Sequence, residues 1–370
     1  MKKIIPLFCC FFSSLFTTAQ YKVELTLPNL VEETSIATVI YYLKDTTRVD
    51  IASSLKSFRE IPIQVWYPAI KDDNRKRAPY MDRLDLYYNA KLIGNIFRDR
   101  FKRVNPQVFI GSKIHNSNIK YPVLLFSPGF GMSRSYYTSL YKYLVNQGYI
   151  VVAIDHTYLN KTVLEKGSAI NPSNGYWDSF PATKSAKSFK EASKKLFFAY
   201  DYFNKDLNFV FSELKKINDN DPKGIFNDSF DLMNVASLGH SAGAMGTKGA
   251  MAKSNSVFKA FITYDVRLDR EYLSATEWID IPNKTNRPIL MFNLEYVQQY
   301  KPIPNEKFFF NYKNNFHYVA LKKMNHSSLS DLDYLRFLDQ KDSIKLKNAK
   351  KNMKIIFQIT TTFLNSYLKE

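Results

Sequence analysis

Cysteine is the residue that this sequence most clearly lacks. The chain of 370 residues contains two, Cys9 and Cys10, and both lie within the first twenty residues. If that segment is removed, the rest of the chain can have no disulfide, no thiol nucleophile and no cysteine metal site. The five histidines form no cluster along the sequence, so we expect neither a metal nor another cofactor.

Long apolar runs are also missing, apart from one at the amino terminus. Lys2 and Lys3 precede an apolar run over residues 4–16, and the small and polar residues 17–20 follow it. A short basic region, an apolar run too short to span a bilayer and small residues at the cleavage positions indicate a secretory signal. We therefore expect a signal peptide over residues 1–19.

The first twenty residues also decide where the protein is expected to be found. Cleavage of the signal predicts export to the periplasm or the extracellular medium. A lipid anchor on Cys9 or Cys10 is the alternative, but Leu7 and Phe8 are a poor match for the small residues that usually precede a lipidated cysteine. No later apolar stretch approaches 18 residues, so we expect the mature chain to be soluble or peripheral to a membrane.

Acidic residues are fewer than basic ones, which gives a formal net charge of +18. A basic surface favours anionic partners such as acidic lipid headgroups, polysaccharides or nucleic acid. The charge is spread along the chain and no nucleic-acid motif accompanies it, so we expect a solvated basic surface and no nucleic-acid partner.

Apolar strand-like segments alternate with helical segments along most of the chain. Strands over residues 121–126 and 149–155 flank a helix over 136–147, which predicts a parallel βαβ unit. Further strands are expected at 235–238, 258–265, 288–293 and 318–322, and helices at 189–217 and 351–368. This pattern predicts an α/β fold with a mostly parallel sheet covered on both faces, preceded by an antiparallel hairpin of strands 35–43 and 61–67.

We expect a single domain over residues 20–370 with two insertions. Residues 71–120 form a polar and aromatic insertion, in which 84–104 read as one amphipathic basic helix. Such a helix can lie on a lipid surface, or it can cover the core with a solvated basic face. Residues 157–187 are rich in Asn, Ser, Gly and Pro, and a loop of this length is often an active-site lid.

A G-x-S-x-G pattern runs from Gly239 to Gly243, directly after the strand at 235–238. A nucleophile on a sharp strand-to-helix turn needs small neighbours, because the chain packs closely on both sides of it. Residues 244–252 are rich in Ala, Met and Gly, as a helix packed behind such a turn would be. We therefore predict that Ser241 is a nucleophile.

A serine nucleophile needs a base to take its proton and a carboxylate to orient that base. Downstream of Ser241 only two histidines remain. His326 lies in a polar loop just after a strand, where an imidazole can reach over the sheet edge, and we predict that it is the base. His317 lies at the start of that strand, where a structural histidine is expected instead.

The acid is expected at the carboxyl edge of the sheet, where catalytic groups on loops collect. Asp265 ends the strand at 258–265 and is the predicted acid. Asp269, four residues later, and Glu295, after the next strand, are the alternatives. Each of these residues alone proves little, and the order serine, acid, histidine carries the prediction.

An oxyanion hole needs two backbone N–H groups aimed at the developing negative charge. One is expected from Ala242, the residue after the nucleophile. The other is expected from Phe130, in the loop Pro128-Gly129-Phe130-Gly131 after the strand at 121–126. The loop lacks the Lys and Ser/Thr of a P-loop, so we do not expect it to bind phosphate.

Seven stretches carry a resemblance to a known family: IPIQVWYPA (61–69), YPVLLFSPGFG (121–131), QGYIVVAIDHTY (147–158), VASLGHSAGA (235–244), FITYDVRL (261–268), RPILMFNLEY (287–296) and KKMNHSSLSDL (322–332). In this order they resemble the secreted platelet-activating-factor acetylhydrolases, or lipoprotein-associated phospholipases, and their bacterial relatives. The resemblance implies an α/β-hydrolase fold and a calcium-independent serine esterase that prefers short or oxidised acyl chains at the sn-2 position of phospholipids.

The resemblance also implies roles for single residues. Ser241 matches the family's nucleophile, Asp265 its acid, His326 its base, and Phe130 and Ala242 its oxyanion amides. Residues 84–104 fall where the animal enzymes carry a lipid-interface helix. Two departures fall at the acyl pocket, because Pro128 replaces the family's usual histidine and Ala242 replaces a bulkier residue.

The expected function is a secreted serine esterase that acts on small acyl esters or phospholipids, with a membrane or lipid surface as a peripheral partner. The first alternative is a carboxylesterase with the same mechanism that acts on non-lipid esters such as acetylated sugars or polyesters. The second is a non-catalytic binding protein on the same fold, which a full set of catalytic candidates argues against.

Overall fold

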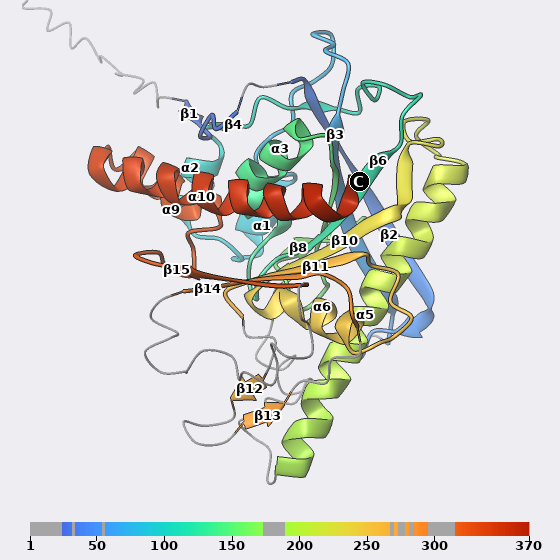
Figure 1. The fold of residues 1–370 in the computed structure, drawn as a ribbon. Coiled ribbons are helices and arrows are strands. Elements are labelled where there is room, and N and C mark those ends of the chain that lie inside the picture. The colour runs from blue at the N-terminus through green and yellow to red at the C-terminus, as the bar shows by residue number, and fades with distance from the viewer. Residues whose placement is uncertain are drawn as a thin grey trace, which may run out of the picture.

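A nine-stranded sheet forms the centre of the molecule in the computed structural model (Figure 1). The structure describes residues 24–31, 34–53, 56–172, 189–266, 270–272, 278–280, 285–294 and 315–369. The signal peptide predicted over residues 1–19 lies outside these ranges.

The strand order in the sheet is β15-β14-β11-β10-β6-β7-β3-β2-β5. Every neighbouring pair in it is parallel except the two pairs that contain β3. This is an α/β-hydrolase fold, as predicted. The strands are β2 (Ile36–Val49), β3 (Phe58–Pro68), β5 (Phe109–Ile110), β6 (Tyr121–Ser127), β7 (Ile150–Ile154), β10 (Phe230–His240), β11 (Ala260–Tyr264), β14 (Ile289–Leu294) and β15 (Phe316–Leu321).

Central strands such as β6 and β7 are almost entirely apolar because both faces of the sheet are covered. Successive side chains of a strand point to opposite faces. In β6, Leu124 and Phe126 enter one core, whereas Val123 and Leu125 enter the other. The near-continuous apolar sequence of β6 follows from this two-sided burial.

Helices cover the two faces of the sheet (Figure 1). One face packs against α3 (Thr138–Asn146), α9 (Asp331–Asp339) and α10 (Ser343–Leu368), and the other against α5 (Phe189–Asp219) and α6 (Ala244–Met251). Glycines bring α6 very close to α5, since a Cβ built on Gly249 would lie 2.1 Å from the carbonyl oxygen of Tyr200. The small residues predicted behind the Ser241 turn therefore serve this helix contact.

The prediction of one helix over residues 84–104 is wrong. The structure has two short helices, α1 (Leu84–Asn89) and α2 (Asn95–Phe101). Lys91 takes a positive φ of 58° in the turn between them, and Leu92 and Ile93 are buried there. Ile93, one of the apolar residues that suggested a continuous amphipathic helix, is therefore buried in the turn between the two helices.

The remaining described elements are short, apart from α9, which the sequence reading missed. Ser330 begins α9, because its hydroxyl accepts a hydrogen bond from the Leu332 amide. The loop at 157–187 is described up to residue 172, and 173–187 lie outside the described residues. The short elements are β1 (Leu25–Thr26), β4 (Val104–Asn105), η1 (Arg134–Tyr137), β8 (Thr162–Val163), β9 (Ala169–Ile170), η3 (Ser241–Gly243), β12 (Arg270–Tyr272) and β13 (Trp278–Asp280).

Across the described ranges, no helix combines the length and the apolar character that crossing a bilayer requires.

Candidate active site

Ser241 lies at a sharp turn between β10 and α6. Its φ is 52°, a left-handed backbone conformation that a residue with a side chain seldom adopts and that is concentrated at functional sites. A Cβ built on Gly239 would lie 2.6 Å from the Cα of Ala244, and one built on Gly243 would lie 2.2 Å from the carbonyl oxygen of Ser127. Both flanking positions therefore require glycine, as the sequence pattern predicts.

Asp265 and His326 are in contact, although 61 residues separate them. The Nδ1 atom of His326 is hydrogen-bonded to Oδ2 of Asp265. Asp265 directly follows β11, and its own amide donates to the carbonyl oxygen of Phe292 at 2.8 Å. The Asp265 side chain is 8% exposed and that of His326 is 46% exposed, so a buried carboxylate holds an accessible imidazole.

His240 links this pair to the Ser241 turn. Its ring centre lies 4.6 Å from that of His326, and its Nδ1 is hydrogen-bonded to the hydroxyl of Tyr137 at 2.7 Å. Burial, followed by the nearby His326, lowers the pKa of His240 to about 3, and Asp265 offsets only part of this shift. His240 is therefore a neutral ring packed between the nucleophile turn and the exposed imidazole.

The alternative candidates are placed differently or lie outside the description. His317 is at the start of β15, where its Nε2 is hydrogen-bonded to the hydroxyl of Tyr367 at 2.9 Å and its ring packs edge-on against Phe363. It therefore joins β15 to α10. Asp269 and Glu295 lie outside the described residues.

The loop after β6 lies against the Ser241 turn, because a Cβ built on Gly129 would be 3.5 Å from Cβ of Ser241. The amides on both sides of Phe130 are used by the fold. That of Gly129 donates to the Tyr137 hydroxyl at 3.2 Å, and that of Gly131 donates to the Leu159 carbonyl at 2.9 Å. The amide of Phe130, between them, stays the predicted oxyanion donor.

A second serine, histidine and aspartate are hydrogen-bonded to one another beneath this loop, and the sequence reading missed them. His156 lies 2.9 Å from the Ser127 hydroxyl through Nε2 and 2.8 Å from Asp206 through Nδ1. Burial would raise the pKa of Asp206, but Arg59 and His156 more than offset it and hold that pKa below its usual range. All of these side chains are fully buried, so Ser127 is not accessible to a substrate and the group is structural.

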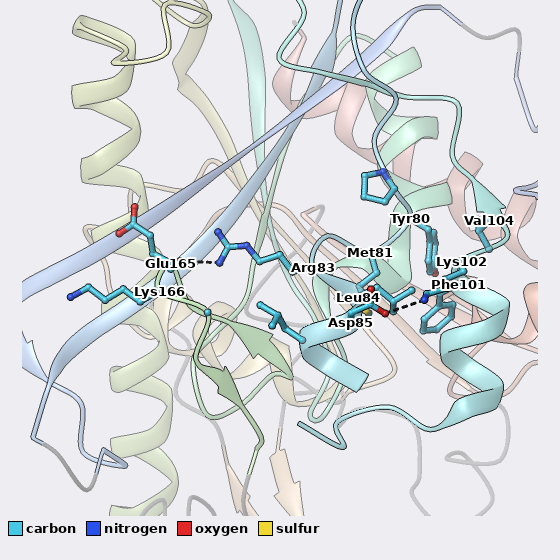
Figure 2. A pocket seen from close by; sticks show the side chains of 13 residues that line it. Tyr80, Met81, Arg83, Leu84, Asp85, Phe101, Lys102, Val104, Glu165 and Lys166 are labelled. Carbon is cyan, nitrogen blue, oxygen red and sulfur yellow. Dashed lines mark hydrogen bonds and ion pairs between the residues drawn. The ribbon is translucent and has the colours of Figure 1, made fainter. Parts of the chain in front are cut away.

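An open pocket of about 660 Å³ lies beside α1 and α2 (Figure 2). On one side Arg83 donates to the carbonyl oxygens of Leu164 and Glu165, and on the other Lys102 pairs with Asp85 at 3.1 Å. None of the predicted catalytic residues lines this pocket.

The same segment carries exposed apolar side chains. Ile96 is 70% exposed and Phe97 is 40% exposed, and both lie next to Arg98 on α2. These apolar side chains therefore stand on the surface beside Arg98, which pairs with Asp85 at 3.7 Å.

No group of three or more His, Cys, Asp or Glu side chains that could hold a metal ion occurs in the part of the chain that the structure describes. The observed contacts join the carboxylate of Asp265 to the imidazole of His326, and that imidazole to the ring of His240, the residue before Ser241. A hydroxyl, an imidazole and a carboxylate are the groups that nucleophilic acyl transfer uses.

Comparisons with known proteins place this geometry in context. A family model described as "Platelet-activating factor acetylhydrolase, isoform II" matches residues 56–370. No curated protein matches the sequence significantly. Among solved structures, a ferulic acid esterase from Streptomyces cinnamoneus is similar in fold, with a TM-score of 0.66, 17% sequence identity and 93% of each chain covered.

Proposed function

Because the chain belongs to the platelet-activating factor acetylhydrolase isoform II family, we propose that it is a serine esterase whose nucleophile, base and acid are Ser241, His326 and Asp265. Membership of this family already makes the protein a carboxylic ester hydrolase. The observation that supports the residue roles best is the Asp265–His326 contact, made beside the strained turn that carries Ser241.

In the first half of the reaction, Ser241 is acylated. With Nδ1–H of His326 donated to Asp265, Nε2 is the basic nitrogen and takes the proton from the Ser241 hydroxyl. The serine oxygen attacks the ester carbonyl, and the resulting tetrahedral intermediate collapses as His326 gives the proton to the leaving alcohol. Asp265 holds the ring in this tautomer and stabilises the imidazolium.

In the second half, water replaces the alcohol. His326 takes a proton from a water molecule, which attacks the acyl group on Ser241, and it returns the proton to the serine oxygen as the carboxylic acid leaves. In both tetrahedral intermediates we propose that the amides of Phe130 and Ala242 donate to the oxyanion. Removal of one such donor typically costs about 10²–10³ in kcat.

Hydrolysis of p-nitrophenyl acetate by purified variants tests the proposal. Ser241→Ala is expected to abolish turnover, and Asp265→Asn to lower kcat by roughly 10⁴, as the loss of a tautomer-orienting carboxylate does in a Ser-His-Asp site. Ser212→Ala is the control, because the Ser212 hydroxyl donates to the Phe209 carbonyl oxygen within α5. Full activity of Ser241→Ala would refute the proposed nucleophile, whereas a wild type without activity would favour the non-catalytic alternative.

For the substrate, we propose phospholipids with short or oxidised sn-2 acyl chains, hydrolysed at a lipid surface. The family supports the substrate class, and the exposed Ile96 and Phe97 beside Arg98 support contact with an anionic lipid surface. We further propose that the protein is exported by its amino-terminal signal and works in the periplasm or outside the cell.

Substitution of Ile96 tests the lipid surface. Ile96→Asp is expected to lower hydrolysis of phospholipid in anionic vesicles while sparing soluble p-nitrophenyl acetate. Met233→Asp is the control, because Met233 is 84% exposed but lies in β10. Equal activity of both variants on vesicles would contradict the interfacial proposal and favour soluble, non-lipid esters such as acetylated sugars.

A further inference from the structure

The carbonyl oxygen of Gly129 is held from two directions. It accepts a hydrogen bond from the side-chain amide of Asn160 at 2.9 Å and another from the Met132 backbone amide at 3.1 Å. The Asn160 amide also reaches the carbonyl oxygen of Pro128, at 3.4 Å. Asn160 therefore contacts both peptide units that lead into the loop after β6.

The direction of the Gly129 carbonyl also sets the direction of the Phe130 amide. The two groups belong to one planar trans peptide unit, in which C=O and N–H point to opposite sides. The described residues contain no cis peptide bond. The hydrogen bond that holds the Gly129 carbonyl toward Asn160 therefore also directs the Phe130 N–H away from Asn160.

Asn160 is itself fixed in one orientation. It is fully buried, and its Oδ1 accepts a hydrogen bond from the backbone amide of His156 at 2.7 Å. Because Oδ1 accepts there, the NH₂ group is the end that faces the loop. His156 is held in turn by Asp206 and Ser127, so Asn160 rests on the buried hydrogen-bonded group beneath the loop.

The loop is confined on its other side by the nucleophile turn. A Cβ built on Gly243 would lie 2.2 Å from the carbonyl oxygen of Ser127 and 2.3 Å from that of Pro128. The loop thus lies between the Ser241 turn and the segment that carries Asn160. A loss of the Asn160 contacts would free it on one side only.

We propose that Asn160 is a positioning residue that aims the Phe130 amide at the oxyanion. The inference rests on the proposed function, since it takes Ser241 as the nucleophile and Phe130 as an oxyanion donor. Asn160 touches no substrate and acts through the Gly129 carbonyl. Because an oxyanion donor stabilises the transition state more than the bound ester, loss of Asn160 lowers kcat and leaves KM nearly unchanged.

The test compares Asn160→Ala with Asn218→Ala on p-nitrophenyl acetate. Asn218 is the matched control, because its side chain also accepts a backbone hydrogen bond, from Phe230 at 2.8 Å, but at the opposite end of β10 from Ser241. Asn160→Ala is expected to lower kcat by about tenfold or more, up to the roughly 10²–10³ that loss of an oxyanion donor costs. Its KM is expected to stay within about twofold of wild type, and Asn218→Ala to keep the wild-type kcat.

Rates are expressed per active site, counted by complete labelling with a fluorophosphonate, so that unfolded protein does not enter the comparison. Asn160→Asp is the second variant, because it keeps the shape and the acceptor for His156 but lacks the NH₂ donor. The same loss of kcat is expected, with an equal loss of affinity for a trifluoromethyl ketone that mimics the tetrahedral intermediate. If Asn160→Ala does not fold, Asn160→Asp decides.

Two failures of this experiment are distinguishable. Absence of a label at Ser241 in the wild type would refute the proposed function. A labelled wild type together with Asn160 variants that retain wild-type kcat per site, or that change KM alone, would overturn the positioning role of Asn160 and leave the proposed function intact.

Discussion

Replacement of Gly243 by alanine probes the contact between the nucleophile turn and the loop after β6. The added Cβ would lie 2.2 Å from the carbonyl oxygen of Ser127 and 2.3 Å from that of Pro128. Both obstacles are backbone atoms, so no side-chain rotation can relieve the contact. The φ of Gly243 is −61°, which alanine also adopts, so the effect of the substitution is steric and not conformational.

The size of the effect follows from the distances. Cβ atoms essentially never approach other atoms more closely than 3.0 Å, so a contact of 2.2 Å requires a shift of at least about 0.8 Å. A shift of about 1 Å in a catalytic group can cost roughly 10² in rate. Overpacking of this kind also typically lowers stability by about 1–3 kcal/mol. We therefore expect Gly243→Ala to fold with reduced stability and to lose about a hundredfold in kcat.

The assay measures kcat and KM on p-nitrophenyl acetate together with the free energy of unfolding in urea. Gly94→Ala is the control, because a Cβ built on Gly94 meets no atom within 4 Å and Gly94 begins α2, apart from the predicted catalytic residues. A folded Gly243→Ala protein with wild-type kcat would show that the loop and the turn do not need their observed contact for catalysis.

Three further predictions follow from single side chains. Burial lowers the pKa of His240 from 6.5 to about 3, so its ring is neutral in the folded protein but takes up a proton on unfolding below pH 6.5. The free energy of unfolding should therefore fall as the pH drops from about 6.5 toward 3, by up to roughly 5 kcal/mol. Urea unfolding of the wild type and of His240→Asn at several pH values measures this loss. Burial raises the pKa of Asp331 to about 7, so the contribution of this carboxyl to stability is lost as the pH rises toward 7. Asp331→Asn removes the buried charge, so it should raise Tm at pH 8 and leave Tm unchanged near pH 4. Phe130→Ala should retain far more activity than Ser241→Ala on p-nitrophenyl acetate, because the proposed donor is the backbone amide of residue 130.

The sheet was predictable because its strands are buried on both faces. Segments such as residues 121–126 and 149–154 are almost entirely apolar, and the structure pairs them in parallel as β6 and β7. Glycines marked the nucleophile turn, since close packing leaves no space for a side chain at Gly239 or Gly243. Patterns of this kind are visible in the sequence because they arise within one strand or one turn.

Features that depend on contacts between distant segments were not predictable. The turn at Lys91 interrupts an amphipathic pattern, and only its tertiary packing buries Leu92 and Ile93. Asn160 reads as an ordinary loop residue, because its role depends on Gly129, which lies 31 positions away in the sequence. His240 occupies a variable position of the G-x-S-x-G pattern, yet it joins Tyr137 to the ring of His326.

The central claim is that Ser241 is the nucleophile, and labelling with a fluorophosphonate tests it most directly. The probe forms a covalent bond with an activated serine, and mass spectrometry of the digested protein locates it. If Ser241 is the nucleophile, the wild type carries one label, on Ser241, and Ser241→Ala carries none and does not hydrolyse p-nitrophenyl acetate. A label that persists in Ser241→Ala, or an active wild type that takes no label at Ser241, would contradict it.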